Sequence, residues 1–207
     1  ATIPFVYLPL ALLLLHKSRN KKYKEEVPGN QVAKSQVAQG SRRTLLRDFR
    51  FWLALPAVLA APFIVTGIFI HQPYILPEMG WSPPLFASCF VFYGVAHWLS
   101  SIYVGGLVDR FSGVQLFRFF PIPMFFGLAV CFSAKGVWTS YVLMTSLGLS
   151  IGASGPIING LWAEVYGTRH LGSIRALVSS LAVLSTAASP VLFGIFIDRG
   201  MSGKQLF

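Results

Sequence analysis

The sequence predicts an all-α protein whose helices form an integral membrane bundle. Three observations support this prediction: 54% of the 207 residues are hydrophobic, only 12% are charged, and the charges gather between long uncharged runs. A soluble domain carries about twice that charged share. Because a water-soluble core could not bury so much continuous apolar sequence, we exclude a soluble enzyme. We find no pattern of catalytic residues, no metal-ligand cluster and no cofactor motif.

Five uncharged runs reach or approach the length that crosses a bilayer, which is about 20 apolar residues in a helix. The predicted spans are residues 51–72, 83–108, 116–134, 137–162 and 174–197. A sixth apolar run, residues 1–15, is too short to cross, and we expect it to be the end of a preceding transmembrane helix. Residues 51–207 are therefore predicted to form one transmembrane bundle.

The basic residues predict the orientation of the bundle. Ten of the 17 Lys and Arg residues lie in the segment 16–50. Because connections rich in Lys and Arg stay in the cytoplasm, this segment is predicted to be a basic cytoplasmic linker. A basic segment beside an apolar run favours anionic lipid as its partner. We therefore expect a lipid bilayer, and no nucleic acid, as a partner despite the net charge of +10.

Two turns between the predicted spans carry a family pattern. The first reads Gly105-Gly-Leu-Val-Asp109-Arg110-Phe-Ser-Gly113, and the second begins at Glu164 and contains Arg169. With the basic linker, these turns resemble the major facilitator superfamily of transporters, whose twelve helices form two six-helix halves. The resemblance implies an incomplete C-terminal half, helices seven to eleven, whose partner is the N-terminal half of the same transporter. Ser112 departs from the family pattern, which has Gly there.

The same turns supply candidate gating residues. Asp109 is costly beside a membrane unless it is paired, and Arg110 is a neighbouring cation. We predict that Arg110 forms an ion pair with Glu164 and that this contact closes the cytoplasmic side in one state. Alternatively, these charges only anchor the helix ends at the membrane surface. The candidate set is Gly105, Asp109, Arg110, Gly113, Glu164 and Arg169.

Candidate substrate-binding residues lie where polar groups interrupt the apolar spans. Tyr93, His97 and Ser100 are spaced i, i+4 and i+7, which places them on one helical face. Such a face avoids lipid and meets other helices or a water-filled cavity. His97 is equally compatible with a hydrogen bond that holds the bundle together. Asn159, in the fourth span, is a further candidate for the pathway.

The outer end of the first span is expected to be bent or broken, because Pro73 and Pro77 remove backbone hydrogen bonds there. Broken membrane helices expose polar groups to a cavity. We therefore predict that His71 and Gln72 line the cavity and that Tyr74 is a lid over it. The alternative for Tyr74 is anchoring at the membrane surface.

Two more patterns predict packing and not binding. Gly148 and Gly152 form a small-xxx-small pair, which favours close contact with a neighbouring helix. The hydroxyl side chains of the last span are expected to bond mostly to the backbone of their own helix.

The resemblance implies a secondary transporter that moves a small solute by alternating access, with monocarboxylate porters of bacteria as the most similar members. It implies a small organic anion such as a monocarboxylate as substrate, a coupling proton as in a symporter, and a plasma membrane location, the bacterial inner membrane being the expected one. One alternative is efflux of apolar or cationic compounds. Another is a membrane scaffold or receptor that does not transport.

Overall fold

The structure is a computed structural model, and it describes residues 46–168 and 171–206. These residues belong to one compact unit, Arg42–Phe207. The predicted helix end at residues 1–15, most of the predicted linker 16–50, and Arg169 lie outside the described residues. Within this part of the chain the structure is helical, and no strand is present.

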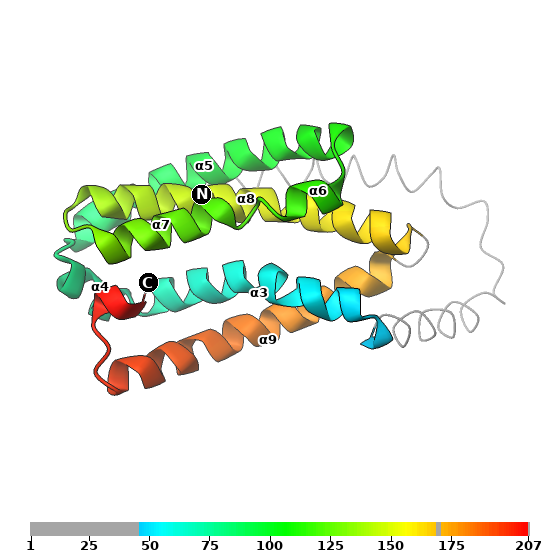
Figure 1. Ribbon diagram of the computed structural model, residues 1–207. Helices are drawn as coiled ribbons and strands as arrows, with labels where there is room; N and C mark the ends of the chain where they lie inside the picture. The colour runs from blue at the N-terminus through cyan, green and yellow to red at the C-terminus, as the bar shows by residue number, and fades with distance from the viewer. Residues whose placement is uncertain (1–45, 169–170, 207) are drawn as a thin grey trace, which may run out of the picture. The chain divides into compact units, whose positions relative to one another are not determined.

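The described residues form seven α-helices and one short 3-10 helix (Figure 1). They are α3 (Phe49–Ile70), α4 (Gln72–Met79), α5 (Pro83–Arg110), α6 (Gly113–Phe117), α7 (Ile122–Ser133), α8 (Trp138–Tyr166), α9 (Leu171–Asp198) and η1 (Gly203–Leu206). Five segments are long and apolar enough to cross a membrane: α3, α5, the stretch Gly113–Ser133, α8 and α9. These five segments lie at the positions of the five predicted spans and in the same order.

Two of the predicted spans are not single continuous helices in the structure. The first ends at Ile70 instead of residue 72, and the separate helix α4 follows. Pro73 has no N–H to bond the carbonyl of Phe69, which removes one hydrogen bond from the helical ladder at the break. The third span is interrupted by a turn between α6 and α7, where Pro121 likewise lacks a backbone donor.

We call the end of the bundle that holds Arg110 and Glu164 the inner end, and the end that holds Gly80 and Gly136 the outer end. The names follow the orientation expected from the basic residues. Figure 1 shows the α5–α6 and α8–α9 connections at one end and the α4–α5, α7–α8 and α9–η1 connections at the other.

Helix α8 is the most buried span and packs against α5, α6 and α7. Its glycines permit this close approach. A Cβ added at Gly148 would strike the backbone carbonyl of Tyr93, and one at Gly152 would strike that of His97. The predicted small-residue contact is therefore present, and its partner is α5.

Helices α3 and α9 pack against each other through hydroxyl groups. The Ser189 Oγ donates to the Phe63 carbonyl oxygen at 2.6 Å, and one turn earlier the Ser185 Oγ donates to the Leu59 carbonyl oxygen at 3.4 Å. The expectation that α9 hydroxyls bond their own helix holds for Ser180 and Thr186. It is wrong for Ser185 and Ser189, because these two lie on the face of α9 that meets α3.

Two clusters of buried side chains make up most of the core. The outer core includes Ile75, Trp81, Phe86 and Met144. A second cluster near the inner end includes Phe51 and Trp162.

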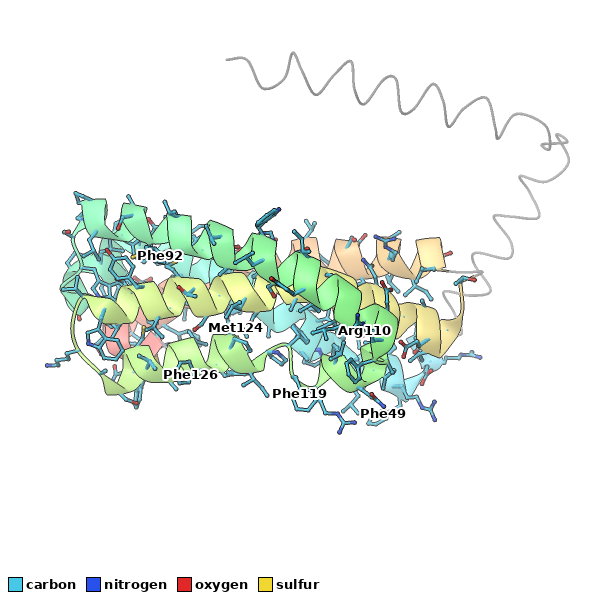
Figure 2. The ribbon with its side chains drawn as sticks, turned by 90° about the horizontal axis from the view of Figure 1, so that it is seen from above. Phe49, Phe92, Arg110, Phe119, Met124 and Phe126 are labelled. Carbon is cyan, nitrogen blue, oxygen red and sulfur yellow. The ribbon has the colours of Figure 1, made fainter. Side chains whose placement is uncertain are left out.

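The exposed positions of α7 are dominated by large apolar side chains: Ile122, Phe125, Phe126 and Phe132 (Figure 2). Such a surface suits contact with lipid.

Candidate functional site

At the inner end, the Glu164 carboxylate binds the beginning of α6. It accepts hydrogen bonds from the Ser112 Oγ at 2.6 Å, the Gly113 backbone N–H at 2.6 Å and the Val114 backbone N–H at 3.4 Å. The first backbone N–H groups of a helix have no partner within that helix, and they carry partial positive charge. The carboxylate at the end of α8 therefore serves as the cap of a neighbouring helix.

Gly113 is placed so that only a residue without a side chain fits. A Cβ at this position would lie 2.6 Å from the Leu161 backbone nitrogen and 2.7 Å from the Gly160 carbonyl carbon. The backbone of α6 thus lies directly on the backbone of α8. This close approach brings the Gly113 N–H within reach of Glu164.

The predicted ion pair between Arg110 and Glu164 is absent from the described part of the chain. Phe111 has an extended backbone (φ −115°, ψ 153°), which ends α5 and leads the chain to the Ser112 cap. The donors of α6 therefore satisfy the carboxylate. Arg110 lies at the exposed end of α5 (Figure 2), and neither it nor Asp109 forms an ion pair with any described residue.

Gly105, the first glycine of the motif, has no close neighbour among the described residues. A Cβ added there would meet nothing within 4 Å among the described residues. In this structure the close helix contact of the motif is made by Gly113.

Near the middle of α5, Tyr93 and His97 form a stacked pair. Their ring centroids are 6.1 Å apart and the ring planes differ by 24°. His97 is exposed and Tyr93 is half-buried. Neither side chain makes a hydrogen bond to any residue within 46–168 or 171–206. The Tyr93 hydroxyl and the His97 imidazole therefore lie about halfway along α5 without a hydrogen-bond partner among the described residues.

On the outer side of this pair, the Tyr93 ring contacts further aromatic rings of α3 and α5. The Phe69 ring of α3 lies 5.1 Å from the Phe90 ring and 5.8 Å from the Tyr93 ring, between centroids. We call Phe69, Phe90 and Tyr93 the aromatic wall. It bridges α3 and α5 just beyond His97 toward the outer end.

The remaining members of the predicted sets have different surroundings. Ser100 is buried, and its Oγ donates to the Leu149 carbonyl oxygen at 2.7 Å, so this hydroxyl is occupied in α5–α8 packing. Asn159 is half-buried on α8, and its side chain makes no hydrogen bond within the described chain. It lies seven residues beyond Gly152, about 10 Å farther toward the inner end.

The break at the outer end of the first span lies at His71, as expected. The His71 Nδ1 is 3.0 Å from the Gly67 carbonyl oxygen, and the imidazole stacks on the Phe193 ring of α9 with centroids 5.8 Å apart. Gln72 is half-buried without a hydrogen bond in the described residues. The Tyr74 hydroxyl donates to the Met201 carbonyl oxygen at 2.8 Å, so a hydrogen bond joins Tyr74 to the segment that follows α9.

Several residues of these sites were not among the sequence candidates. Ser112 stands at the N-cap position of α6, but its hydroxyl donates to Glu164 and makes no cap hydrogen bond, so its role could not be predicted from the preference for Ser at helix starts. Phe69 had no local signal either, since its role depends on a contact between two helices. In the described residues, His, Cys, Asp and Glu do not gather into any group of three that could hold a metal ion.

Comparison with known proteins agrees with this architecture. The sequence model of the Major Facilitator Superfamily matches residues 1–199. Neither a curated protein nor a solved structure matches the chain. The family match includes every membrane-spanning helix described above, together with the Glu164 turn and the Asp109-Arg110 motif. The chain therefore belongs to the Major Facilitator Superfamily, a family of membrane transporters.

Proposed function

We propose that this chain is part of a secondary transporter that moves a small solute by alternating access, and that its described spans form one half of the molecule. The observation that carries the proposal is the exposed imidazole of His97 in the middle of α5, with no hydrogen bond to any described residue. A polar side chain at that depth is costly in lipid. It therefore favours a position facing water, a solute or another part of the transporter.

The chemistry of this face supports an organic anion as the solute. His97 and Tyr93 offer N–H and O–H donors that suit a carboxylate. Because the described spans place no Lys or Arg near the middle of the membrane, the cation that a carboxylate usually needs would have to come from another part of the transporter. An imidazole has two ring nitrogens, either of which can carry a proton. We propose a monocarboxylate as the substrate class and a proton as the coupling ion.

The aromatic wall favours a second candidate, the export of apolar compounds. Its rings offer a large apolar contact and only one hydroxyl group, which suits a solute without charge. The two candidates require different side-chain chemistry from the same face, so one set of measurements separates them.

The test is uptake and counterflow with the complete transporter that contains this chain, reconstituted in vesicles. A panel of small organic acids is compared with a panel of apolar compounds of similar size. We expect saturable uptake of at least one organic acid, and a loss of that uptake in His97→Ala with normal membrane insertion. Phe126→Leu, at an exposed position on α7, is the control and should transport normally.

Three results would contradict the proposal. Unchanged kinetics in His97→Ala would remove His97 from the pathway. Transport of the apolar panel alone would favour the export function. Movement of neither panel would favour a membrane protein that does not transport.

A further inference from the structure

The start of α3 carries two arginines whose charge no described neighbour neutralises. Arg47 and Arg50 are exposed, and neither forms an ion pair with any residue in 46–168 or 171–206. Between Glu26 and Glu78 the sequence contains a single acidic residue, Asp48. Asp48 is therefore the one acid close in sequence that could pair with either arginine, and its own contacts decide whether it does.

The Asp48 carboxylate is held by two hydrogen bonds. Its Oδ1 accepts the Arg50 backbone N–H at 2.9 Å and so caps the beginning of α3, and its Oδ2 accepts the Tyr166 hydroxyl of α8 at 3.0 Å. Both carboxylate oxygens thus have donors that are not guanidinium groups. The cap also uses the partial positive charge of the helix beginning. The two arginine side chains therefore remain available to an anion from outside the protein.

An exposed apolar face continues from these arginines along α3. Phe49, Trp52, Leu53 and Pro56 are spaced i, i+3, i+4 and i+7, which places them on one side of the helix, and all four are exposed. Phe49 is 74% exposed and Leu53 is 69% exposed. The opposite side, which includes Phe51, is buried in the cluster near the inner end. The first two turns of α3 thus offer a continuous apolar surface beside two free cations.

Trp52 lies where the basic and the apolar parts of this surface meet. Its Nε1 donates to the Leu46 carbonyl oxygen at 2.9 Å, which holds the segment that carries Arg47 against the first turns of α3. A Trp ring at a helix end is typical of the boundary between lipid and water. Figure 2 shows Phe49 at the same end of the bundle as Arg110, the inner end. The order from basic to aromatic to aliphatic matches the headgroup, boundary and acyl chain of a phospholipid.

We propose that the start of α3 binds an anionic phospholipid, whose phosphate group contacts Arg47 and Arg50 and whose acyl chains lie along Phe49 and Leu53. A guanidinium group binds phosphate oxygens through two parallel hydrogen bonds, and the cytoplasmic leaflet supplies anionic lipid at the expected inner end. The apolar face favours a lipid over free inorganic phosphate, which would leave these side chains in water. The Tyr166 hydroxyl positions the site, because it keeps the Asp48 carboxylate away from the arginines.

The first test measures which lipid lies against this face in the complete transporter that contains this chain. Leu53→Cys carries a fluorescent label, and brominated phosphatidylglycerol and brominated phosphatidylcholine are compared as quenchers in vesicles. We expect a preference for phosphatidylglycerol of roughly 5-fold for each arginine, the factor that one basic residue near an anionic surface is worth. Arg47→Gln/Arg50→Gln should remove this preference.

Two controls accompany this measurement. Arg199→Gln changes an exposed arginine that follows α9 at the outer end, and it should keep the preference for phosphatidylglycerol. The two native cysteines of the chain are buried, and the protein without Leu53→Cys gives the background of the label.

The second test examines how Tyr166 acts. Tyr166→Phe removes the donor from one oxygen of Asp48, which lets the carboxylate turn toward an arginine, and the preference should fall by up to about 5-fold, the factor of a surface ion pair. Asp48→Asn keeps a good N-cap but removes the charge, so its preference should be at least that of the parent protein. The double variant Asp48→Asn/Tyr166→Phe should regain what Tyr166→Phe loses, whereas a structural defect would not be rescued.

The contradicting results are distinct from one another. Quenching by neither lipid would show that protein covers this face of α3. Equal quenching by both lipids in the parent protein, or an unchanged preference in Arg47→Gln/Arg50→Gln, would exclude the arginines as a headgroup site. Failure of Asp48→Asn to restore the preference in Tyr166→Phe would exclude the role of Tyr166. None of these measurements requires transport, so they decide the lipid site even if the proposed function fails.

Discussion

The Glu164 carboxylate accepts the backbone N–H of Gly113 at 2.6 Å, which joins the inner end of α8 to the first turn of α6. The contact pairs a carboxylate with the partial positive charge of a helix beginning and with the Ser112 hydroxyl. The Glu164 carboxylate is therefore bound by N–H and O–H donors at the start of α6, and not by the Arg110 side chain as we had predicted. The distinction changes what mutations at this end should do.

Charge exchange between Arg110 and Glu164 is the first prediction. Glu164→Arg removes the acceptor and places a cation against the helix beginning, so we expect transport to fall by roughly an order of magnitude. Arg110→Glu does not supply a new acceptor for the α6 donors. The double variant Arg110→Glu/Glu164→Arg should therefore be no better than Glu164→Arg alone, as measured by initial uptake rates. Recovery in the double variant would restore the ion-pair interpretation.

Gly113 and Gly105 form a matched pair of glycines for the second prediction. Gly113→Ala puts a Cβ against the backbone of Gly160 and Leu161, and neither backbone can move aside easily. We expect the free energy of unfolding to fall by about 1–3 kcal/mol, as for other overpacked sites. Gly105→Ala enters open space in the described structure and should not destabilise the protein. Thermal unfolding of both purified variants measures the difference.

If Gly105→Ala were the more damaging of the two in the complete transporter, Gly105 would be the close-contact glycine of the motif. That result would indicate a neighbour outside residues 46–168 and 171–206.

The third prediction concerns the hydroxyl contacts between α3 and α9. Ser189 is fully buried, and its Oγ bonds the Phe63 carbonyl oxygen of the other helix. Ser189→Ala should lower the free energy of unfolding by about 0.6–1 kcal/mol, the usual value of such a bond between membrane helices. Ser180→Ala is the control, because that hydroxyl is exposed and bonds its own helix at Ala176. Its effect should stay within about 0.5 kcal/mol.

The features that could be predicted from the sequence depend on local composition. The five spans follow from uncharged runs, and the break at His71 follows from Pro73, since both signals act within one helix. The turn between α6 and α7 had a similar signal in Pro121, which we did not use. These elements could be predicted because they do not depend on contacts with a neighbouring helix.

The parts that were missed depend on contacts between helices. The charges of Arg110 and Glu164 were visible, but α6 has only five residues and no hydrophobic period, so its backbone donors were not considered as partners. The aromatic wall joins Phe69 to Phe90 and Tyr93, which lie on different helices. The hydroxyls of Ser185 and Ser189 could face their own helix or another one, and only the packing of α9 decides between the two.

The last prediction separates the two candidate substrate classes at Tyr93. Tyr93→Phe keeps the ring that packs against Phe69 and removes only the hydroxyl group. If the solute is an organic anion held by that hydroxyl, KM should rise about 3- to 10-fold, the value of one lost hydrogen bond, while kcat changes little. Tyr93→Leu removes the hydroxyl and the ring together and should be worse. If the solute is apolar, Tyr93→Phe should transport normally and only Tyr93→Leu should be impaired. Uptake rates across a range of solute concentrations distinguish the two patterns, because the ring and the hydroxyl contribute to different solutes.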